Sequence, residues 1–289
     1  MDSGEPDGWS TDEGDPLGSS RLWSHRCRWE DLAELDGHVD DGREGLVLTA
    51  DWARRWTATR RYGGGEVTAA VRDLASMPTA GAEPVRGFSW HRGQRHRPGL
   101  QFLVSTGRYH GYESLQEARL LLALDFAADP TDVVSQPLRL RYSTGDGWRE
   151  HTPDFLADIG SGRWLIDVRP AARVAAQDRV AFAATAEAAL LHGWFYAVVT
   201  GWKPHVATTV DALSSQRRPL TDPLGMIGVL LADTATAVRP FAELAERTPV
   251  PAVARAFLLH LLWHRRVGID LARPLSDRTL VHPAGSLPR

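Results

Sequence analysis

Apolar residues recur at helical spacing after residue 113, at Leu115, Leu121, Leu122 and Phe126. Ser114 stands immediately before this stripe, and serine is a favoured helix N-cap. Asp129-Pro130 follows the stripe, and proline cannot continue a helix. The pattern therefore predicts one amphipathic helix that begins after Ser114 and ends before Asp129.

Three extended patterns follow, over residues 133–142, 152–159 and 163–169. The turn-rich run 143–147 separates the first two, and the third ends at Pro170. The third pattern alternates strictly. Its alternation predicts two faces, one with Trp164, Ile166 and Val168 and the other with Leu165, Asp167 and Arg169.

The alanine-rich residues 172–192 predict a helix that Gly193 closes, and the apolar run 194–200 predicts a buried strand. The order helix, three strands, helix, strand indicates a mixed α/β domain with at least one crossover connection. Apolar stripes over residues 222–238 and 251–266 indicate that the chain becomes helical again.

These patterns divide the chain into four parts. Residues 1–20 hold six acidic side chains and no basic one, which predicts a disordered acidic tail. Residues 21–83 form an N-terminal region to which no chemistry can be assigned. Residues 84–203 contain the α/β core, and residues 204–289 form a helical C-terminal region.

The composition narrows the possible functions. No apolar run among the 289 residues approaches the roughly 18 residues of a membrane span, and no signal-peptide pattern opens the chain. We therefore expect a cytoplasmic protein without a membrane partner. Cys27 is the only cysteine, which excludes an internal disulfide and a cysteine-rich zinc site. A net charge of −3 argues against a strongly basic nucleic-acid binder but leaves room for a local basic patch.

Three carboxylates are the best candidates for chemistry, because the usual phosphate-loop, zinc-helix, nucleophile-elbow and dinucleotide motifs are absent from the sequence. Glu117 lies on the first predicted helix, Asp154 begins the second strand, and Asp167 lies on the third. A hairpin between these strands would place Asp154 beside Asp167. Convergent carboxylates suit a hard cation such as Mg²⁺, which could activate water for attack on a phosphodiester.

Each carboxylate also has a purely structural interpretation. Ser114-x-x-Glu117 is a capping box, so Glu117 would cap its own helix. If the register of the match is shifted, Glu113 is the nearest substitute for Glu117 as a metal ligand. Asp154 follows a proline and would be a turn residue. Asp167 would form a buried ion pair with Arg169, because a charge on a central strand is costly to bury alone.

Short motifs occur along the chain in a defined order: Glu113-Ser114-Leu115-Gln116-Glu117, Leu124-Asp125-Phe126, Ser135-Gln136-Pro137-Leu138, Thr152-Pro153-Asp154-Phe155, Asp167-Val168-Arg169-Pro170 and Gly193-Trp194. Their order and spacing resemble the TnsA-like endonuclease subunits of heteromeric transposases, in the PD-(D/E)XK nuclease superfamily. The resemblance covers residues 84–201 well and residues 261–276 more loosely. It implies a restriction-endonuclease-like α/β core, a mixed central sheet flanked by helices, followed by the helical C-terminal portion.

The resemblance further implies a DNA endonuclease that cuts at transposon ends beside a separate transposase subunit and an ATPase regulator. Carried over by position, Glu117, Asp154 and Asp167 are the expected ligands of Mg²⁺ or Mn²⁺. Arg169 is the fourth expected catalytic residue and stands where the family has lysine. Arginine stays protonated, so it would position phosphate or stabilise charge rather than accept a proton. Lys203, the only lysine in the chain, is a weaker candidate for the lysine's role.

Arginine, histidine and aromatic residues are mixed in the glycine-bearing segment 86–97, and this mixture suits phosphate contacts with ring stacking. The expected DNA-binding residues are Arg86, Arg92, Arg95 and Arg97. The alternative is a solvated loop that Phe88 and Trp90 anchor to the core. Two other functions stay open: a catalytically inactive adaptor that bridges DNA and transposition proteins, and a restriction or repair nuclease on the same core.

Overall fold

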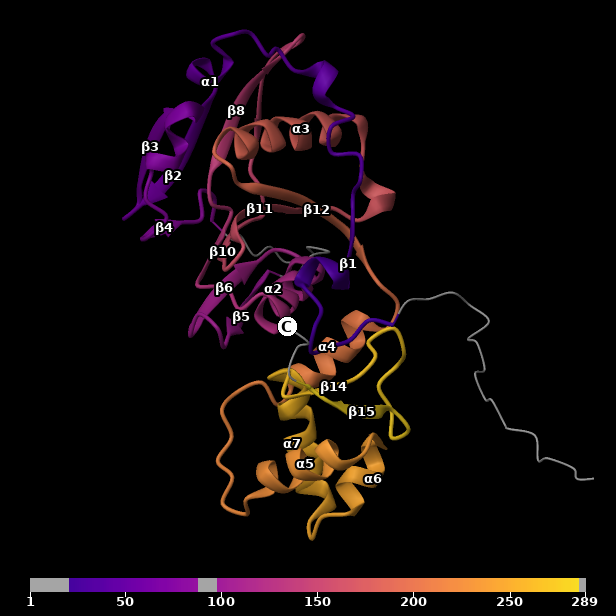
Figure 1. Ribbon diagram of the computed structural model, residues 1–289. Helices are drawn as coiled ribbons and strands as arrows, with labels where there is room; N and C mark the ends of the chain where they lie inside the picture. Colours follow the sequence, from indigo (N-terminus) through magenta and orange to yellow (C-terminus); the bar gives the residue numbers. More distant parts are fainter. Residues whose placement is uncertain (1–20, 88–97, 286–289) are drawn as a thin grey trace, which may run out of the picture.

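The computed structural model describes residues 21–87 and 98–285. The predicted acidic tail at 1–20 lies outside the described residues, as do Arg92, Arg95 and Arg97. The chain is α/β, with one mixed sheet, further antiparallel strands and several helices (Figure 1).

The central sheet is mixed, as the sequence predicted. Its strands, in spatial order, are β1 (Ala33–Leu35), β12 (Phe195–Trp202), β11 (Gly162–Val168), β10 (Phe155–Ile159) and β7 (Asp132–Ser135). β11 and β12 run parallel, and every other neighbouring pair is antiparallel. β11 therefore lies in the middle of the sheet, as expected for the strand that carries Asp167.

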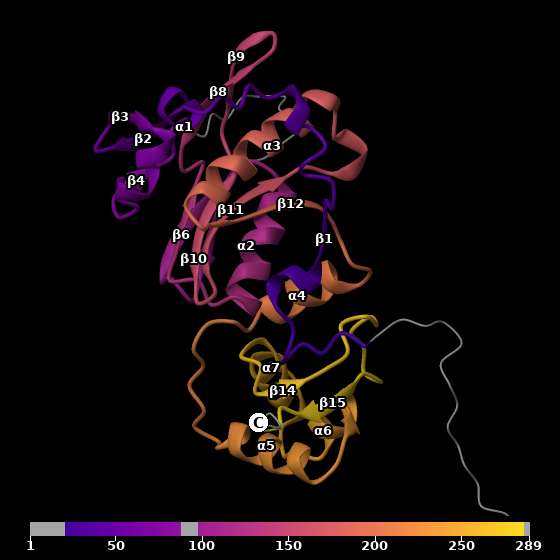
Figure 2. The same cartoon turned by 45° about the horizontal axis from the view of Figure 1, so that its top comes forward.

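Helices α2 (Leu115–Ala127) and α3 (Ala176–Leu191) cover opposite faces of this sheet (Figure 2). Leu121 and Leu124 of α2 pack with Ile166 of β11 in one buried cluster. Alanines of α3 pack with Leu165 in another. The predicted alternation along β11 is thus confirmed, because successive side chains of a strand enter different layers.

Helix α2 begins and ends where its sequence indicates. Ser114 is the N-cap, and its Oγ accepts a hydrogen bond from the Glu117 amide at 3.2 Å. Beyond the last turn, Asp129 adopts a φ of 49°, in the left-handed region, and Pro130 follows. The cap satisfies an otherwise unpaired amide at the first turn, and the left-handed residue turns the chain away from the helix.

The first extended pattern, predicted as one strand over 133–142, is two strands in the structure. Gln136 has a φ of 46° and Pro137 lacks an amide hydrogen, so the chain leaves the central sheet after β7. It then joins a different sheet as β8 (Arg139–Thr144), which pairs with β9 (Gly147–His151). The turn that connects β8 and β9 is shorter than the predicted turn over residues 143–147. β9 was not predicted, because its exposed residues carry little apolar signal.

The second sheet joins the N-terminal region to the core. Its strand order is β3-β2-β8-β9, with β4 also paired to β2. The N-terminal strands are β2 (Thr57–Tyr62), β3 (Gly65–Ala70) and β4 (Ala82–Glu83). Trp56 and Tyr142 are buried in the same cluster as the α3 alanines, so this sheet packs beside α3.

The remaining elements before residue 204 are short. They comprise α1 (Trp52–Arg55), the hairpin β5 (Gly99–Leu103) and β6 (Arg108–Tyr112), and the 3₁₀ helices η1 (Trp29–Leu32), η2 (Arg43–Gly45), η3 (Val71–Ser76) and η4 (Ala171–Arg173).

The C-terminal region is mainly helical, as predicted, with a small sheet in addition. Its elements are α4 (Val206–Ser214), α5 (Met226–Thr236), β13 (Arg239–Pro240), α6 (Phe241–Glu246), α7 (Pro251–Trp263), β14 (Val267–Gly268) and β15 (Leu280–Pro283). The strand order is β13-β15-β14. Phe126 of α2 and Leu261 of α7 belong to one buried cluster, so apolar packing joins this region to the core. No helix among the described residues is long and apolar enough to cross a membrane.

An ion-pair network on α5 leads to a testable prediction. Asp233 accepts a hydrogen bond from Arg247 at 2.7 Å and pairs with Arg239 at 3.3 Å. The hydrogen bond from Arg247, followed by the charges of both arginines, lowers the pKa of Asp233. Replacing Asp233 with asparagine should lower the free energy of unfolding by about 1 kcal/mol at pH 7.

This loss should depend on pH in one direction. A carboxyl group whose folded pKa is depressed stabilises the protein above its ordinary pKa, and the contribution disappears as pH falls through the folded value. Urea denaturation at pH 7 and near pH 3 measures the difference. An equal loss at both pH values would contradict the ion-pair explanation.

Candidate functional site

Asp154, the residue before β10, lies beside Asp167 of β11. β10 and β11 are antiparallel, with Phe155 opposite Ile166. The Oδ2 atom of Asp154 accepts a hydrogen bond from the amide of Val168 at 2.7 Å. The predicted hairpin placement is confirmed, because Asp154 is bonded directly to the residue that follows Asp167.

Asp167 is buried, with an exposed fraction of 3%. Its two oxygens both lie 3.0 Å from Nε2 of His151, and Oδ2 also accepts a hydrogen bond from the Tyr196 hydroxyl at 2.7 Å. His151 ends β9 and Tyr196 lies on β12, so three strands converge at this carboxylate.

Arg169 does not pair with Asp167, so the proposed internal ion pair is wrong. Its guanidinium instead lies 3.1 Å from Asp178 at the start of α3, and its Nε donates to the carbonyl oxygen of Arg173 at 3.3 Å. The reason is local geometry. The chain turns into η4 directly after β11, and this turn brings the first turn of α3 within reach of the Arg169 side chain.

Glu117 does cap its own helix. One carboxylate oxygen accepts a hydrogen bond from the Glu113 amide at 2.7 Å, and the other accepts from the Ser114 hydroxyl at 2.8 Å. Glu113 in turn pairs with Arg86 at 2.7 Å. Arg86, the one predicted DNA-binding residue that is described, therefore lies at the N-terminal end of α2 beside Glu117.

The pKa of Asp154 responds to the charges of the other two carboxylates. Burial raises the pKa of Asp154 well above its ordinary value, and the negative charges of Asp167 and Glu117 raise it further. The Val168 amide and the charge of Arg86 act in the opposite direction. Burial also raises the pKa of Glu117, although its hydrogen bonds from Glu113 and Ser114 oppose this. Asp154 is thus the point where the charges of all three groups act together.

His151 and Tyr196 respond to the same charges. Burial lowers the pKa of His151, but the charge of Asp167 and the hydrogen bond to it outweigh burial, and the net shift is upward. Burial and the charge of Asp167 raise the pKa of Tyr196 well above its ordinary value. Both upward pKa shifts favour the protonated form of the side chain, so Asp167 faces a charged imidazole and a neutral phenol.

The sequence assigned no role to His151, Tyr196 or Gln136. The Gln136 amide donates to the carbonyl oxygen of Asp154 at 2.7 Å, so the two backbones touch. Its side chain is buried, and neither polar atom has a hydrogen-bond partner among the described residues. His151 lies only three positions before Asp154, and this proximity in sequence could have identified it as a site residue. Nothing in the sequence indicated Tyr196, because only strand pairing brings it to Asp167.

The three carboxylates have the right chemistry to bind a divalent cation, but their present geometry does not form a metal site. Hard cations prefer carboxylate oxygens. A cation between these groups would offset the negative charges of Asp167 and Glu117, which add to burial in raising the pKa of Asp154. Yet within residues 21–87 and 98–285, no group of three or more His, Cys, Asp and Glu side chains is placed to hold a metal ion. Hydrogen bonds occupy Glu117 and Asp167, which would have to exchange these partners for the ion.

Lys203 follows directly after β12. Its amide donates to the carbonyl oxygen of Leu32 at 3.2 Å, and the residue is exposed. No ion pair joins it to a carboxylate among the described residues. Its predicted substitution for the family lysine stays a prediction.

Comparison with models of protein families and with curated proteins finds no match for this chain. The resemblance to TnsA-like endonucleases therefore rests on the motifs alone.

Proposed function

We propose that the protein is a divalent-metal-dependent DNA endonuclease subunit of the TnsA-like type, which works with a separate transposase and an ATPase regulator. The observation that carries the proposal is the placement of Asp154, just before β10, beside Asp167 of the neighbouring strand β11, with Glu117 close enough for its charge to act on Asp154. The chain order α2, β7, β10, β11, α3, β12 around one mixed sheet supports a PD-(D/E)XK core.

In this proposal, Glu117, Asp154 and Asp167 hold Mg²⁺ or Mn²⁺. When bound, the ion supplies Lewis-acid stabilisation of the phosphodiester and lowers the pKa of water. His151 and Tyr196 orient Asp167 through their hydrogen bonds. Such bonds to a carboxylate ligand fix its geometry. Arg86 and Arg169 supply positive charge to the DNA phosphates.

The decisive experiment is DNA cleavage with Mg²⁺ or Mn²⁺ in the presence of the partner transposase and a substrate that carries transposon ends. We expect cleavage by the wild-type chain and none by the Asp154→Ala variant. The proposal fails if the complete mixture shows no cleavage that depends on Asp154.

Arg169 allows a separate prediction. Because its role in the proposal is to supply positive charge, Arg169→Lys should retain cleavage within about threefold, while Arg169→Ala should lose about 10- to 100-fold. Initial cleavage rates measure both. An alanine variant as active as the wild type would remove Arg169 from the site.

The second candidate is a catalytically inactive adaptor. One observation favours it: Arg169 is bound to Asp178 rather than directed to the carboxylates. Calorimetric titration with Mn²⁺ separates the two functions. Binding that Asp154→Ala removes supports the nuclease, and absence of binding supports the adaptor. For a restriction or repair nuclease on the same core, neighbouring genes without a transposase would be the distinguishing observation.

A further inference from the structure

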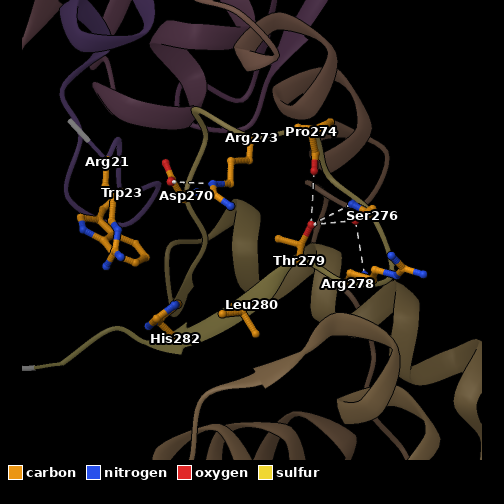
Figure 3. Close-up of a pocket in the computed structure, with 10 residues that line it drawn as sticks. All are labelled: Arg21, Trp23, Asp270, Arg273, Pro274, Ser276, Arg278, Thr279, Leu280 and His282. Carbon is orange, nitrogen blue, oxygen red and sulfur yellow. Dashed lines mark hydrogen bonds and ion pairs between the residues drawn. The ribbon is translucent and has the colours of Figure 1, made fainter. Parts of the chain in front are cut away.

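A cavity of about 440 Å³ opens in the C-terminal region, away from the carboxylates (Figure 3). Arg21 and Arg278 both line it, but their side chains lie at opposite ends of the view, and Arg278 is directed away from Trp23. One anion cannot contact both guanidinium groups. These two arginines therefore do not form an anion site.

Two other arginines do meet, at one aromatic ring of the second sheet. The guanidinium carbon of Arg141, on β8, is 4.8 Å from the centroid of the Trp148 ring on β9. The guanidinium carbon of Arg55, at the end of α1, is 6.0 Å from the same centroid. All three residues are exposed, and the exposed fraction of Trp148 is 43%. They form one accessible patch, which we call the Trp148 surface.

The positive charge of the Trp148 surface is not cancelled by ion pairs. In the part of the chain that the structure describes, Arg55 and Arg141 contact the indole and no carboxylate pairs with either. Glu150 lies opposite Arg141 in the register of β8 and β9, but its carboxylate is 3.7 Å from Arg139. Asp146, in the turn of the hairpin, is likewise paired within the hairpin. Two guanidinium groups are therefore available to a polyanion.

Strand β9 connects the Trp148 surface to the candidate site. It ends at His151, whose Nε2 lies 3.0 Å from both oxygens of Asp167. A strand rises about 3.3 Å per residue, so Trp148 lies about 10 Å from His151 along β9. β9 is the last strand of its sheet, and its first four residues are all exposed, so both of its faces are open. Figure 2 shows the β8–β9 turn projecting beyond α3.

We propose that the Trp148 surface binds the DNA duplex that flanks the cleaved phosphodiester, with Arg55 and Arg141 on backbone phosphates and the indole against the neighbouring sugar. A duplex held at the carboxylates extends past the end of β9, and arginine contacts with its phosphates fix its orientation without reading its sequence. Two-stranded β-ribbons also fit the DNA grooves. The choice of DNA over another polyanion rests on the proposed nuclease function.

The test measures binding of a fluorescent double-stranded oligonucleotide to the full chain by anisotropy, at low salt and in EDTA. Arg141→Ala should weaken binding about tenfold and reduce the slope of log Kd against log salt by about 1. Arg141→Lys retains the charge and should stay within about threefold of the wild type. Arg218→Ala is the matched control and should change Kd less than about twofold. Arg218 is also an exposed arginine over an aromatic ring, 5.1 Å from the Phe102 centroid, but it lies in the C-terminal region.

Three results would overturn the Trp148 surface as a DNA site. They are equal binding by the wild type and Arg141→Ala, equal losses for Arg141→Ala and Arg218→Ala, and absence of duplex binding by the wild type at low salt. Trp148→Ala should weaken DNA binding about threefold. If it instead lowers only cleavage in the presence of the transposase, the surface belongs to a protein partner. Since EDTA excludes metal-dependent cleavage, failure of the nuclease proposal would leave the binding results unchanged.

Discussion

Replacing Asp154 with asparagine is expected to abolish DNA cleavage and to make the protein more stable. Cleavage should fall at least about 1000-fold, since the variant lacks a charged ligand of the proposed metal site. Stability should rise by roughly 1–2 kcal/mol, because a neutral amide removes the repulsion from Asp167 and Glu117 and the cost of burying a charge. The asparagine side-chain oxygen can still accept the hydrogen bond from Val168.

The stability gain should grow with pH. The folded pKa of Asp154 is raised, so the folded protein binds its proton more tightly than the unfolded chain does. That contribution is complete below the ordinary aspartate pKa and is lost as pH rises through the folded value. The variant titrates no such group. Metal-free thermal denaturation between pH 4 and pH 8 should therefore show curves that converge at the acidic end.

Asp158→Asn on the same strand is the matched control. Asp158 binds Arg163 through both oxygens, at 2.6 and 2.8 Å, and this pair lies at the other end of β10. Its replacement should lower stability and leave cleavage unchanged. If Asp154→Asn instead lowers stability at pH 8, repulsion among the three carboxylates is not a dominant feature of the folded protein.

Asp125→Ala should destabilise the protein by about 3 kcal/mol, which is the second large effect. Asp125 is buried on α2, and its carboxylate accepts hydrogen bonds from the amides of Val104 and Ser105 at 3.0 and 2.9 Å. The Ser105 hydroxyl adds a third at 2.7 Å. These bonds hold the β5–β6 turn against the helix, so alanine leaves several donors unsatisfied at once.

Urea denaturation of three variants measures this effect. Asp125→Asn keeps one acceptor oxygen and should lose roughly half as much stability as Asp125→Ala, and Ser105→Ala should lose about 1 kcal/mol. A loss below about 1 kcal/mol for Asp125→Ala would show that the turn does not depend on the carboxylate. The Leu124-Asp125-Phe126 motif would then need another explanation.

Short-range sequence patterns were sufficient to predict the helices and strands whose apolar residues recur with a clear period. Helix α2 and strand β11 lie where capping, alternation and the flanking prolines indicated, because each signal acts between residues close in the chain. The same reasoning failed at Gln136, where one left-handed residue and a proline divide an apparently continuous strand between two sheets. Sheet membership depends on partners that the local pattern does not contain.

The candidate site likewise has a part that the sequence predicted and a part that only the tertiary structure determined. The chain alone gave Glu117, Asp154 and Asp167 as candidates and predicted the approach of Asp154 to Asp167 across a hairpin, since motif spacing and strand alternation are local properties. Folding determined the partners. Asp167 met His151 and Tyr196, and Arg169 met Asp178, because strand pairing and the turn into α3 join residues between 9 and 29 positions apart. Contacts between residues this far apart in the sequence depend on how the strands and helices pack in three dimensions, and a local stretch of sequence does not specify that packing.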